Sequence, residues 1–326
     1  MPIILESDLQ ESFQKAIQKA NKTNSSILFS NVVKTQNVNP LSFYQVGRER
    51  YLGERLFWKD SNSDTVIVGL GKMEKVQTSA DHNRFDNIEQ RWNAIVEQSF
   101  VQANHRESGT GPIMFGGISF DPEKSNSLLW DQFGDNFFYV PQYMITVTKN
   151  GTYFTTNIVC SSKSDIEACI HQLKQGKELL KKCGDNEICN ANACINKEEV
   201  EPNLWKQQVA DAVQTIKETS VNKIVLAREL RLTFEHQIES EAILAHLLKE
   251  QPTSFIYSLE AGSDCFIGAS PERLVKKENK HVLSTCLAGS IARGKNKDED
   301  EVLGNRLLHD PKNLMEHQFV VSMIQE

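Results

Sequence analysis

Two hairpin patterns constrain this fold most, because each ties a pair of strands into an antiparallel sheet. The first is rich in β-branched and aromatic residues and turns at Asn150-Gly151, a dipeptide typical of the tight turns that close hairpins. The second turns around Gly262. The two strand pairs are 137–148 with 152–159, and 255–259 with 266–269. Helical patterns alternate with these strands, which predicts an α+β fold with helices packed outside stacked antiparallel sheets.

Helical and strand patterns cover most of the remaining chain. Apolar residues recur at helical spacing in the segments 9–20, 88–100, 165–182, 205–216 and 243–248. Further strand patterns cover 26–29, 65–68 and 113–120. A polar stretch with several cysteines interrupts these patterns and is the best internal boundary. We therefore predict an N-terminal portion, residues 1–198, and a second region, residues 199–326, in which Asn203 caps the first helix.

Composition excludes several classes of protein. The chain is 39% hydrophobic and 24% charged, which is typical of globular proteins, and its net charge of -7 gives no basic surface for nucleic acid. The N-terminal residues lack the basic and apolar parts of a signal peptide, and no apolar run is long enough to cross a membrane. We expect a cytoplasmic protein that binds neither nucleic acid nor membrane.

The cysteines fit reduced thiols better than a disulfide framework. Their number, seven, is odd, and they are scattered through the chain. Cys183, Cys189 and Cys194 lie close together, but their spacing matches no zinc pattern and no histidine lies near them. We expect a polar linker there and no metal site.

Four segments contain polar residues that are candidates for a functional site. They read VNKIVLAREL at 221–230, FIGASPERLV at 266–275, LSTCLAGSIARG at 283–294 and KNLMEHQFVVSMI at 312–324. Lys223 lies in a β-branched run that predicts a strand, Glu272 follows Pro271 after a predicted strand, and Glu316 lies on a predicted helix. Taken singly, each has a plain structural interpretation: a solvated edge lysine, a common turn and a solvated carboxylate.

Together, in this order and at these distances, the four segments resemble the chorismate-utilising enzymes, and most of all the isochorismate synthases. The resemblance implies that Lys223 is the base that activates water and that Glu272 is the general acid. It also implies that Gly289 and Ser290 contact the substrate and that Glu316 is a ligand of Mg²⁺. The implied substrate is chorismate, a small dianion, and the implied cofactor is Mg²⁺.

The chemistry of isochorismate formation explains why such a pair is needed. Water attacks C2 of chorismate while the 4-hydroxyl group leaves, so a base and an acid flank the ring. A lysine acts as a base only when neutral, and its ordinary pKa of about 10.4 has to be lowered for that. A glutamate acts as an acid only when protonated, which requires the opposite shift. A closed, partly apolar pocket moves both groups in the needed direction.

Two positions distinguish the members of this family. Relatives that use ammonia have glutamine at the position of Lys223, and the aminodeoxychorismate enzymes have a nucleophilic lysine at the position of Ala288. Lys223 together with Ala288 therefore implies water as the nucleophile. Salicylate synthases share the lysine, so they and the siderophore-pathway isochorismate synthases remain alternatives. The segment FGGISFDP at 115–122 favours the menaquinone-pathway type.

The end of the chain raises a further alternative. The last predicted helix carries apolar residues without a partner, namely Phe319, Val320, Met323 and Ile324. The resemblance implies that family members continue beyond this point and supply a second metal carboxylate and a substrate arginine there. We expect a fold that is incomplete at its C-terminus, and a 326-residue form that is inactive and poorly stable. A non-catalytic remnant of such an enzyme is therefore a further alternative, and the oligomeric state stays open.

Overall fold

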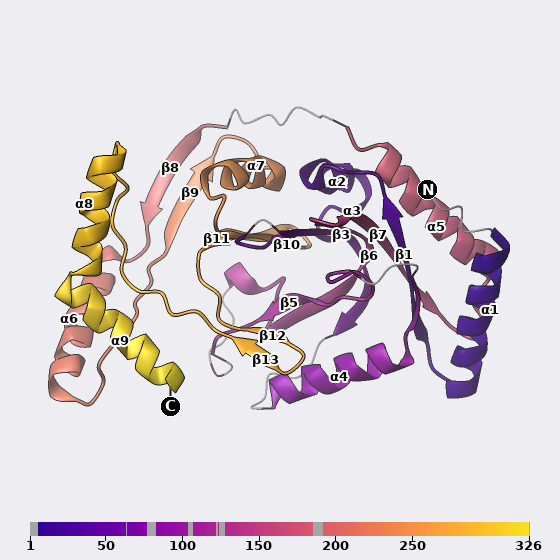
Figure 1. Ribbon diagram of the computed structural model, residues 1–326, viewed down its shortest axis with the longest axis horizontal. Coiled ribbons are helices and arrows are strands. Elements are labelled where there is room, and N and C mark those ends of the chain that lie inside the picture. The colour runs from indigo at the N-terminus through magenta and orange to yellow at the C-terminus, as the bar shows by residue number, and fades with distance from the viewer. Residues whose placement is uncertain are drawn as a thin grey trace. The chain divides into compact units, whose positions relative to one another are not determined.

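The computed structural model describes residues 6–62, 64–76, 83–103, 107–121, 123, 128–184 and 192–325 (Figure 1). Contacts divide the chain into two compact units. Unit 1 comprises residues 1–190 and 239–271, and unit 2 comprises residues 191–238 and 272–326. The chain thus passes between the units after residues 190, 238 and 271. The predicted division at residue 198 treats each part as one continuous stretch, and it stays a prediction.

Unit 1 is built on a nine-stranded sheet with the order β11-β10-β2-β3-β6-β7-β1-β4, in which β5 also pairs with β6. Its strands are β1 (Ile27–Thr35), β2 (Arg55–Lys59), β3 (Thr65–Val76), β4 (Phe100–Ala103), β5 (Phe115–Ile118), β6 (Asn136–Thr148), β7 (Gly151–Cys160), β10 (Phe255–Ala261) and β11 (Asp264–Ser270). All neighbours are antiparallel except β1 and β4. Both predicted hairpins are confirmed, with Thr148 opposite Gly151 and Ala261 opposite Asp264.

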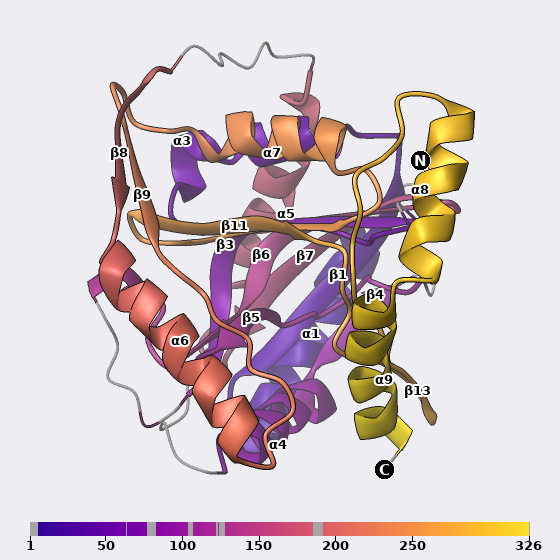
Figure 2. The ribbon, with the colours of Figure 1, turned by 90° about the vertical axis from the view of Figure 1, so that its left-hand side faces the viewer.

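Helices cover this sheet, which confirms the α+β prediction. They are α1 (Glu6–Thr23), α2 (Pro40–Val46), α3 (Arg48–Tyr51), α4 (Arg84–Gln98), α5 (Ile166–Lys181) and α7 (Ser240–Glu250), with a short 3₁₀ turn at Leu128–Trp130. Within unit 1, α2 and α7 lie on one side of the sheet and α4 lies on the other (Figures 1 and 2). The main core joins Phe43 of α2, Leu179 of α5 and Leu244 of α7 to Tyr143 and other side chains of the sheet. A second cluster packs α1 and α5 on β1 and β7.

A buried group of charged and hydroxyl side chains joins distant parts of unit 1. Arg55 on β2 binds Glu260 on β10 at 2.6 Å and Glu241 on α7, and all three side chains are almost completely buried. Tyr44 donates its hydroxyl to Glu260 at 3.1 Å. Burial opposes the charge of Glu260, but the hydrogen bonds and charge of Arg55 and the backbone N–H of Gly53 outweigh it and lower the pKa of Glu260. This network ties residues 239–271 to the N-terminal part of unit 1.

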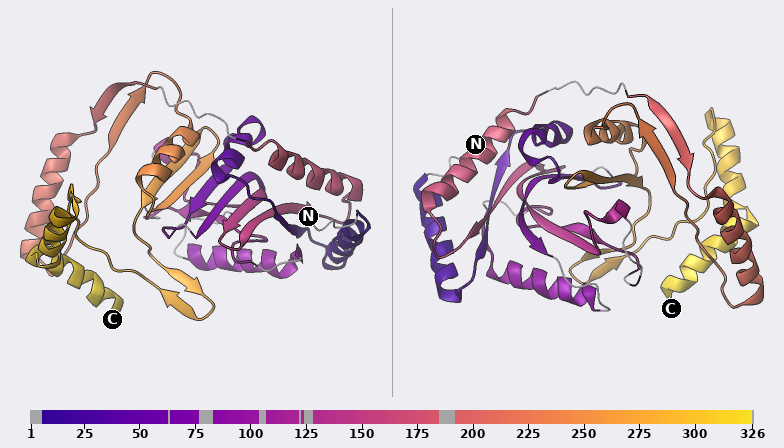
Figure 3. Two further views of the ribbon diagram at one scale, coloured as in Figure 1. Left: turned by 45° about the horizontal axis from the view of Figure 1, so that its top comes forward. Right: turned by 180° about the vertical axis from the view of Figure 1, so that it is seen from behind.

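The described residues of unit 2 form two small sheets and three helices. Its elements are β8 (Cys194–Glu199), α6 (Pro202–Glu218), β9 (Leu230–Phe234), β12 (Lys276–Glu278), β13 (His281–Leu283), α8 (Lys297–Leu308) and α9 (Pro311–Gln325). β8 pairs with β9, and β12 pairs with β13, both antiparallel (Figure 3). None of the described residues of unit 2 is fully buried, and Val225 is 81% exposed.

Two local predictions in unit 2 are wrong. The predicted strand at 221–230 is irregular until Leu230, because β8 reaches only as far as the pair Glu199 and Leu230, so no described strand lies beside the residues before it. Asn203 does not cap α6, since Pro202 takes the first helical position and Glu201 becomes the N-cap. Proline favours that position because its missing N–H would have no partner there.

Candidate active site

All the predicted site residues lie in unit 2, and an ion pair joins two of them. The ammonium of Lys223 lies 3.2 Å from a carboxylate oxygen of Glu316. The two side chains are 35% and 38% exposed, and a pair at that exposure contributes little to stability. The pair shows that the irregular segment around Lys223 reaches helix α9.

The sequence explains where α9 begins. The carboxylate of Asp310 accepts the backbone N–H of Asn313 at 2.8 Å, and Pro311 takes the first helical position. An N-terminal cap of this kind satisfies donors that the helix itself leaves unpaired. Glu316 is therefore held in the second turn of the helix.

The predicted substrate loop lies on the same helix. Gly289 has a φ of +81°, a conformation that glycine adopts readily and other residues avoid. A Cβ atom on Gly289 would lie 2.8 Å from Cγ of Asn313, so the backbone of the loop touches α9 directly. Asn313 and Glu316 are three residues apart and share a face of α9. Ser290 follows on the same loop and is exposed.

Glu272 lies at the start of a neighbouring segment. Pro271 separates it from the end of β11, and the residues after it pair with those that lead to the loop. The hydroxyl of Thr285 donates to the carbonyl of Arg273 at 3.2 Å, and that of Ser284 donates to the carbonyl of Leu274 at 2.8 Å. Glu272 is exposed. The desolvation that its role as an acid needs stays a prediction.

The segment that carries Lys223 is also anchored at its far end. The guanidinium of Arg228 lies 5.4 Å from the ring centre of Trp205 on α6 and 3.3 Å from a carboxylate oxygen of Glu199. Stacking and pairing of this kind fix an arginine more firmly than either contact alone. Sequence analysis missed Arg228, Trp205 and Asn313. Each is recognisable only through a contact between segments that are far apart in the chain.

The charges set a condition on the proposed chemistry. A carboxylate beside a lysine stabilises the ammonium form, whereas a base has to carry the neutral amine. In this structure the carboxylate of Glu316 lies 3.2 Å from the ammonium of Lys223. A cation is the natural alternative partner for that carboxylate.

The donor set near Lys223 fits Mg²⁺ in part. Mg²⁺ is held by one or two carboxylates together with water and substrate oxygens, and Glu316 provides one such oxygen donor. Among the described residues, no three His, Cys, Asp or Glu side chains gather into a metal-binding group. Of the cysteine cluster, Cys183 and Cys194 are free thiols and Cys189 lies outside the described residues.

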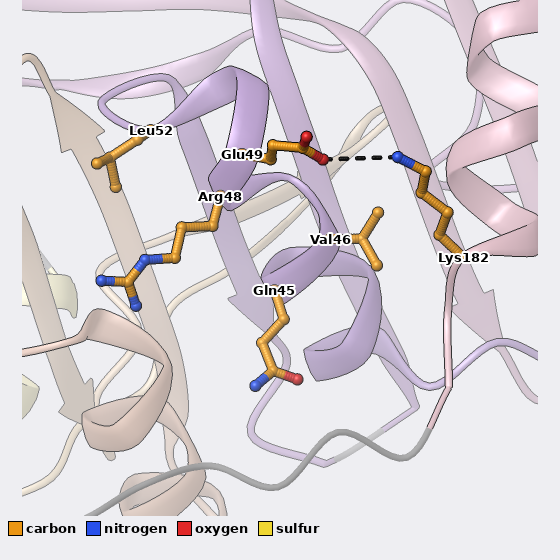
Figure 4. A pocket seen from close by; sticks show the side chains of 6 residues that line it. All are labelled: Gln45, Val46, Arg48, Glu49, Leu52 and Lys182. Carbon is orange, nitrogen blue, oxygen red and sulfur yellow. Dashed lines mark ion pairs between the residues drawn. The ribbon is translucent and has the colours of Figure 1, made fainter.

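One surface pocket is lined by residues of unit 1. It has a volume of about 550 Å³ and is lined by Gln45, Val46, Arg48, Glu49, Leu52 and Lys182 (Figure 4). Its charges are already paired: Lys182 lies 3.5 Å from Glu49, and Arg48 lies 2.6 Å from Glu239. It contains none of the predicted site residues.

Comparison with known proteins identifies the family. The model of the chorismate binding enzyme family matches residues 15–326, so this chain belongs to the chorismate binding enzymes. It is 38% identical over 325 residues to isochorismate synthase MenF of Bacillus subtilis, covering 97% of this chain and 69% of that protein. It is 26% identical over 334 residues to the salicylate biosynthesis isochorismate synthase of Pseudomonas aeruginosa, covering 97% of this chain and 65% of that protein. The predicted family and its enzymatic class, that of the isochorismate synthases, are thereby confirmed.

Solved structures show the same fold. The menaquinone-specific isochorismate synthase MenF of Escherichia coli matches with a TM-score of 0.67 at 20% identity, over 95% of this chain and 67% of that one. Anthranilate synthase component I of Streptococcus pneumoniae matches with a TM-score of 0.60 at 19% identity, over 79% of this chain and 60% of that one. The chain spans between 60% and 69% of the length of these relatives. No described helix combines the length and the apolar character that crossing a bilayer requires.

Proposed function

We propose that this protein converts chorismate to isochorismate with Mg²⁺, in the menaquinone pathway. The observation that carries the proposal is the contact of Lys223 with Glu316 at 3.2 Å on the helix that also holds the Gly289 loop. Three of the four motif segments thus meet at α9. The relative that is 38% identical bears the name isochorismate synthase, which supports the same reaction.

In the proposed reaction, Lys223 accepts a proton from the water that attacks C2, and Glu272 donates a proton to the 4-hydroxyl group as it leaves. One water adds at C2 and the 4-hydroxyl group leaves as water, so the reaction balances. The backbone of Gly289 and the hydroxyl of Ser290 hold the substrate. Bound Mg²⁺ would supply positive charge beside the substrate carboxylates, with Glu316 as one of its protein ligands. We also propose that the protein is located in the cytoplasm.

The nucleophile and the product distinguish the proposed enzyme from the alternatives. Lys223 with Ala288 favours water and disfavours a covalent lysine intermediate. A salicylate synthase shares Lys223 but eliminates pyruvate after isochorismate has formed. A siderophore-pathway isochorismate synthase would give the same product in another pathway. A non-catalytic remnant would give no product at all.

Product analysis tests the proposal. The 326-residue chain and the product of the complete reading frame that contains it are incubated separately with chorismate and Mg²⁺, and the products are separated by chromatography. We expect isochorismate without pyruvate from the complete product. Salicylate together with pyruvate would identify the alternative enzyme, and the absence of any product from both proteins would support the remnant.

A further inference from the structure

Asn313 is the point at which helix α9 touches the substrate loop. A Cβ atom on Gly289 would lie 2.8 Å from Cγ, 2.8 Å from Oδ1 and 2.9 Å from Cβ of Asn313. Cβ, Cγ and Oδ1 of Asn313 therefore lie close to the backbone of Gly289. A side chain at position 289 would therefore meet Asn313, and one of the two residues would have to move.

The backbone is fixed at both residues of this contact, Asn313 and Gly289. The backbone N–H of Asn313 donates to the carboxylate of Asp310, which holds the first turn of α9. Gly289 has a φ of +81°, so the loop reaches the helix in a conformation that depends on glycine. Asn313 is half-buried, whereas its neighbours Lys312 and Leu314 are exposed. Of these three residues, Asn313 is the one that the fold partly covers.

The same face of α9 carries Glu316, which pairs with Lys223. Asn313 and Glu316 are three residues apart, so they are neighbours on the helix surface. We infer that Asn313 is a positioning residue, which sets the place of residues 288–290 relative to Glu316 and Lys223 by packing against Gly289. This inference rests on the proposed function, because its effect is on chorismate. Asn313 acts through Gly289 and is not itself assigned a contact with substrate.

Steady-state kinetics of Asn313→Ala tests the role. Truncation removes Cγ and Oδ1, the support of the loop, so the KM for chorismate is expected to rise about tenfold while kcat changes less than about threefold. Lys312→Ala is the matched control on the same helical turn, and its KM is expected to stay within about twofold of the parent value. A KM for Asn313→Ala within the control range, in a parent enzyme that is active, would overturn the inference.

A double-mutant cycle with Gly289→Ala tests the contact itself. The added methyl group would meet Asn313, and kcat/KM is expected to fall about a hundredfold. Shortening Asn313 removes two of the three atoms in its way, so the double variant should lose less than the product of the two single losses. Losses that multiply would show that the two residues act independently and would contradict the inference.

Hydrogen exchange separates failure of this inference from failure of the proposed function. In Asn313→Ala, amides of the peptide that covers residues 285–294 should exchange several-fold faster than in the parent or in Lys312→Ala. This measurement needs no activity. A parent protein that makes no isochorismate would refute the proposed function, whereas unchanged exchange in this peptide would refute the role of Asn313.

Discussion

At the scale of single residues, the pair formed by Lys223 and Glu316 connects the fold to the proposed chemistry. The two side chains meet at 3.2 Å although 93 positions separate them in the chain. The pair is half-exposed, so water screens its attraction. Its value lies in bringing a proposed base next to a proposed metal ligand. Each of these roles can be tested separately by substitution.

Removal of either proton-transfer group should slow the reaction without abolishing binding. Lys223→Ala and Glu272→Gln are each expected to lower turnover by about 10² or more, since each removes a positioned acid or base. Turnover is measured at saturating chorismate, and affinity by calorimetry. Lys280→Ala and Glu301→Gln, which alter exposed residues of unit 2, are the matched controls. Near-normal turnover in either test variant would show that its proton-transfer role is assigned to the wrong residue.

Glu260 provides a second residue-scale prediction, which concerns pH. The pKa of Glu260 is lowered in the folded state. As pH falls, this carboxylate therefore takes up a proton in the unfolded chain first, at about pH 4.3. The stabilisation is therefore complete above that pH and is lost as pH falls through the folded-state pKa. Glu260→Gln is expected to cost about 1–3 kcal/mol at pH 7, because it weakens charged hydrogen bonds from Arg55.

The variant should also make stability depend less steeply on pH between about pH 5 and pH 3. Urea unfolding of the parent and of Glu260→Gln across this range measures both effects. Glu250→Gln, an exposed change on α7, controls for the loss of one surface charge. Parallel stability curves for the parent and Glu260→Gln would contradict the lowered pKa.

At the scale of elements, two helical glycines should respond to the same substitution with opposite signs. Gly176 of α5 packs on β6 and β7, where a Cβ atom would lie 2.6 Å from a ring carbon of Tyr143 and 2.9 Å from one of Phe154. Gly304 of α8 has no such neighbour within 4 Å. Alanine favours helices over glycine by about 1 kcal/mol, whereas overpacking a core costs about 1–3 kcal/mol.

We therefore expect Gly176→Ala to destabilise α5 and Gly304→Ala to stabilise α8. Hydrogen exchange of peptides from the two helices gives the free energy of local opening for each. Each variant serves as the control for the other, since both make the same chemical change. Stabilisation of α5 by Gly176→Ala would mean that the rings of Tyr143 and Phe154 move aside at little cost.

Elements with strong local signals were predicted well. The turn at Asn150-Gly151 and the periodic helix α5 are determined by residues close in sequence. The strand expected at Lys223 was wrong because a strand also needs a neighbour, and β8 ends opposite Leu230. A β-branched run shows which conformation the backbone favours locally, and it does not show whether a partner is present.

The same limit applies to the candidate site. Lys223, Gly289 and Glu316 lie in recognisable segments, and the structure brings them together at α9. Asn313 and Arg228 carry no local signal, because their importance comes from contacts with Gly289 and Trp205. The same is true of Arg55 and Glu260, which are 205 positions apart. Such partners are found only once the chain has folded.

At the scale of the whole molecule, the two units differ in how they are stabilised. Unit 1 contains the large aromatic and aliphatic core, together with the buried network of Arg55. Unit 2 contains every proposed site residue, and none of its described residues is fully buried. Function is thus proposed for the part with the least buried surface, where local opening is easiest.

The incorporation of solvent oxygen tests the central claim most directly, which is that Lys223 activates water for attack on chorismate. The protein is incubated with chorismate and Mg²⁺ in ¹⁸O-labelled water, and the product is analysed by mass spectrometry. The account predicts isochorismate that carries one solvent oxygen, at C2. It also predicts that Lys223→Ala forms this product at no more than about one hundredth of the parent rate. Isochorismate without the label, or salicylate and pyruvate as the main products, would contradict it.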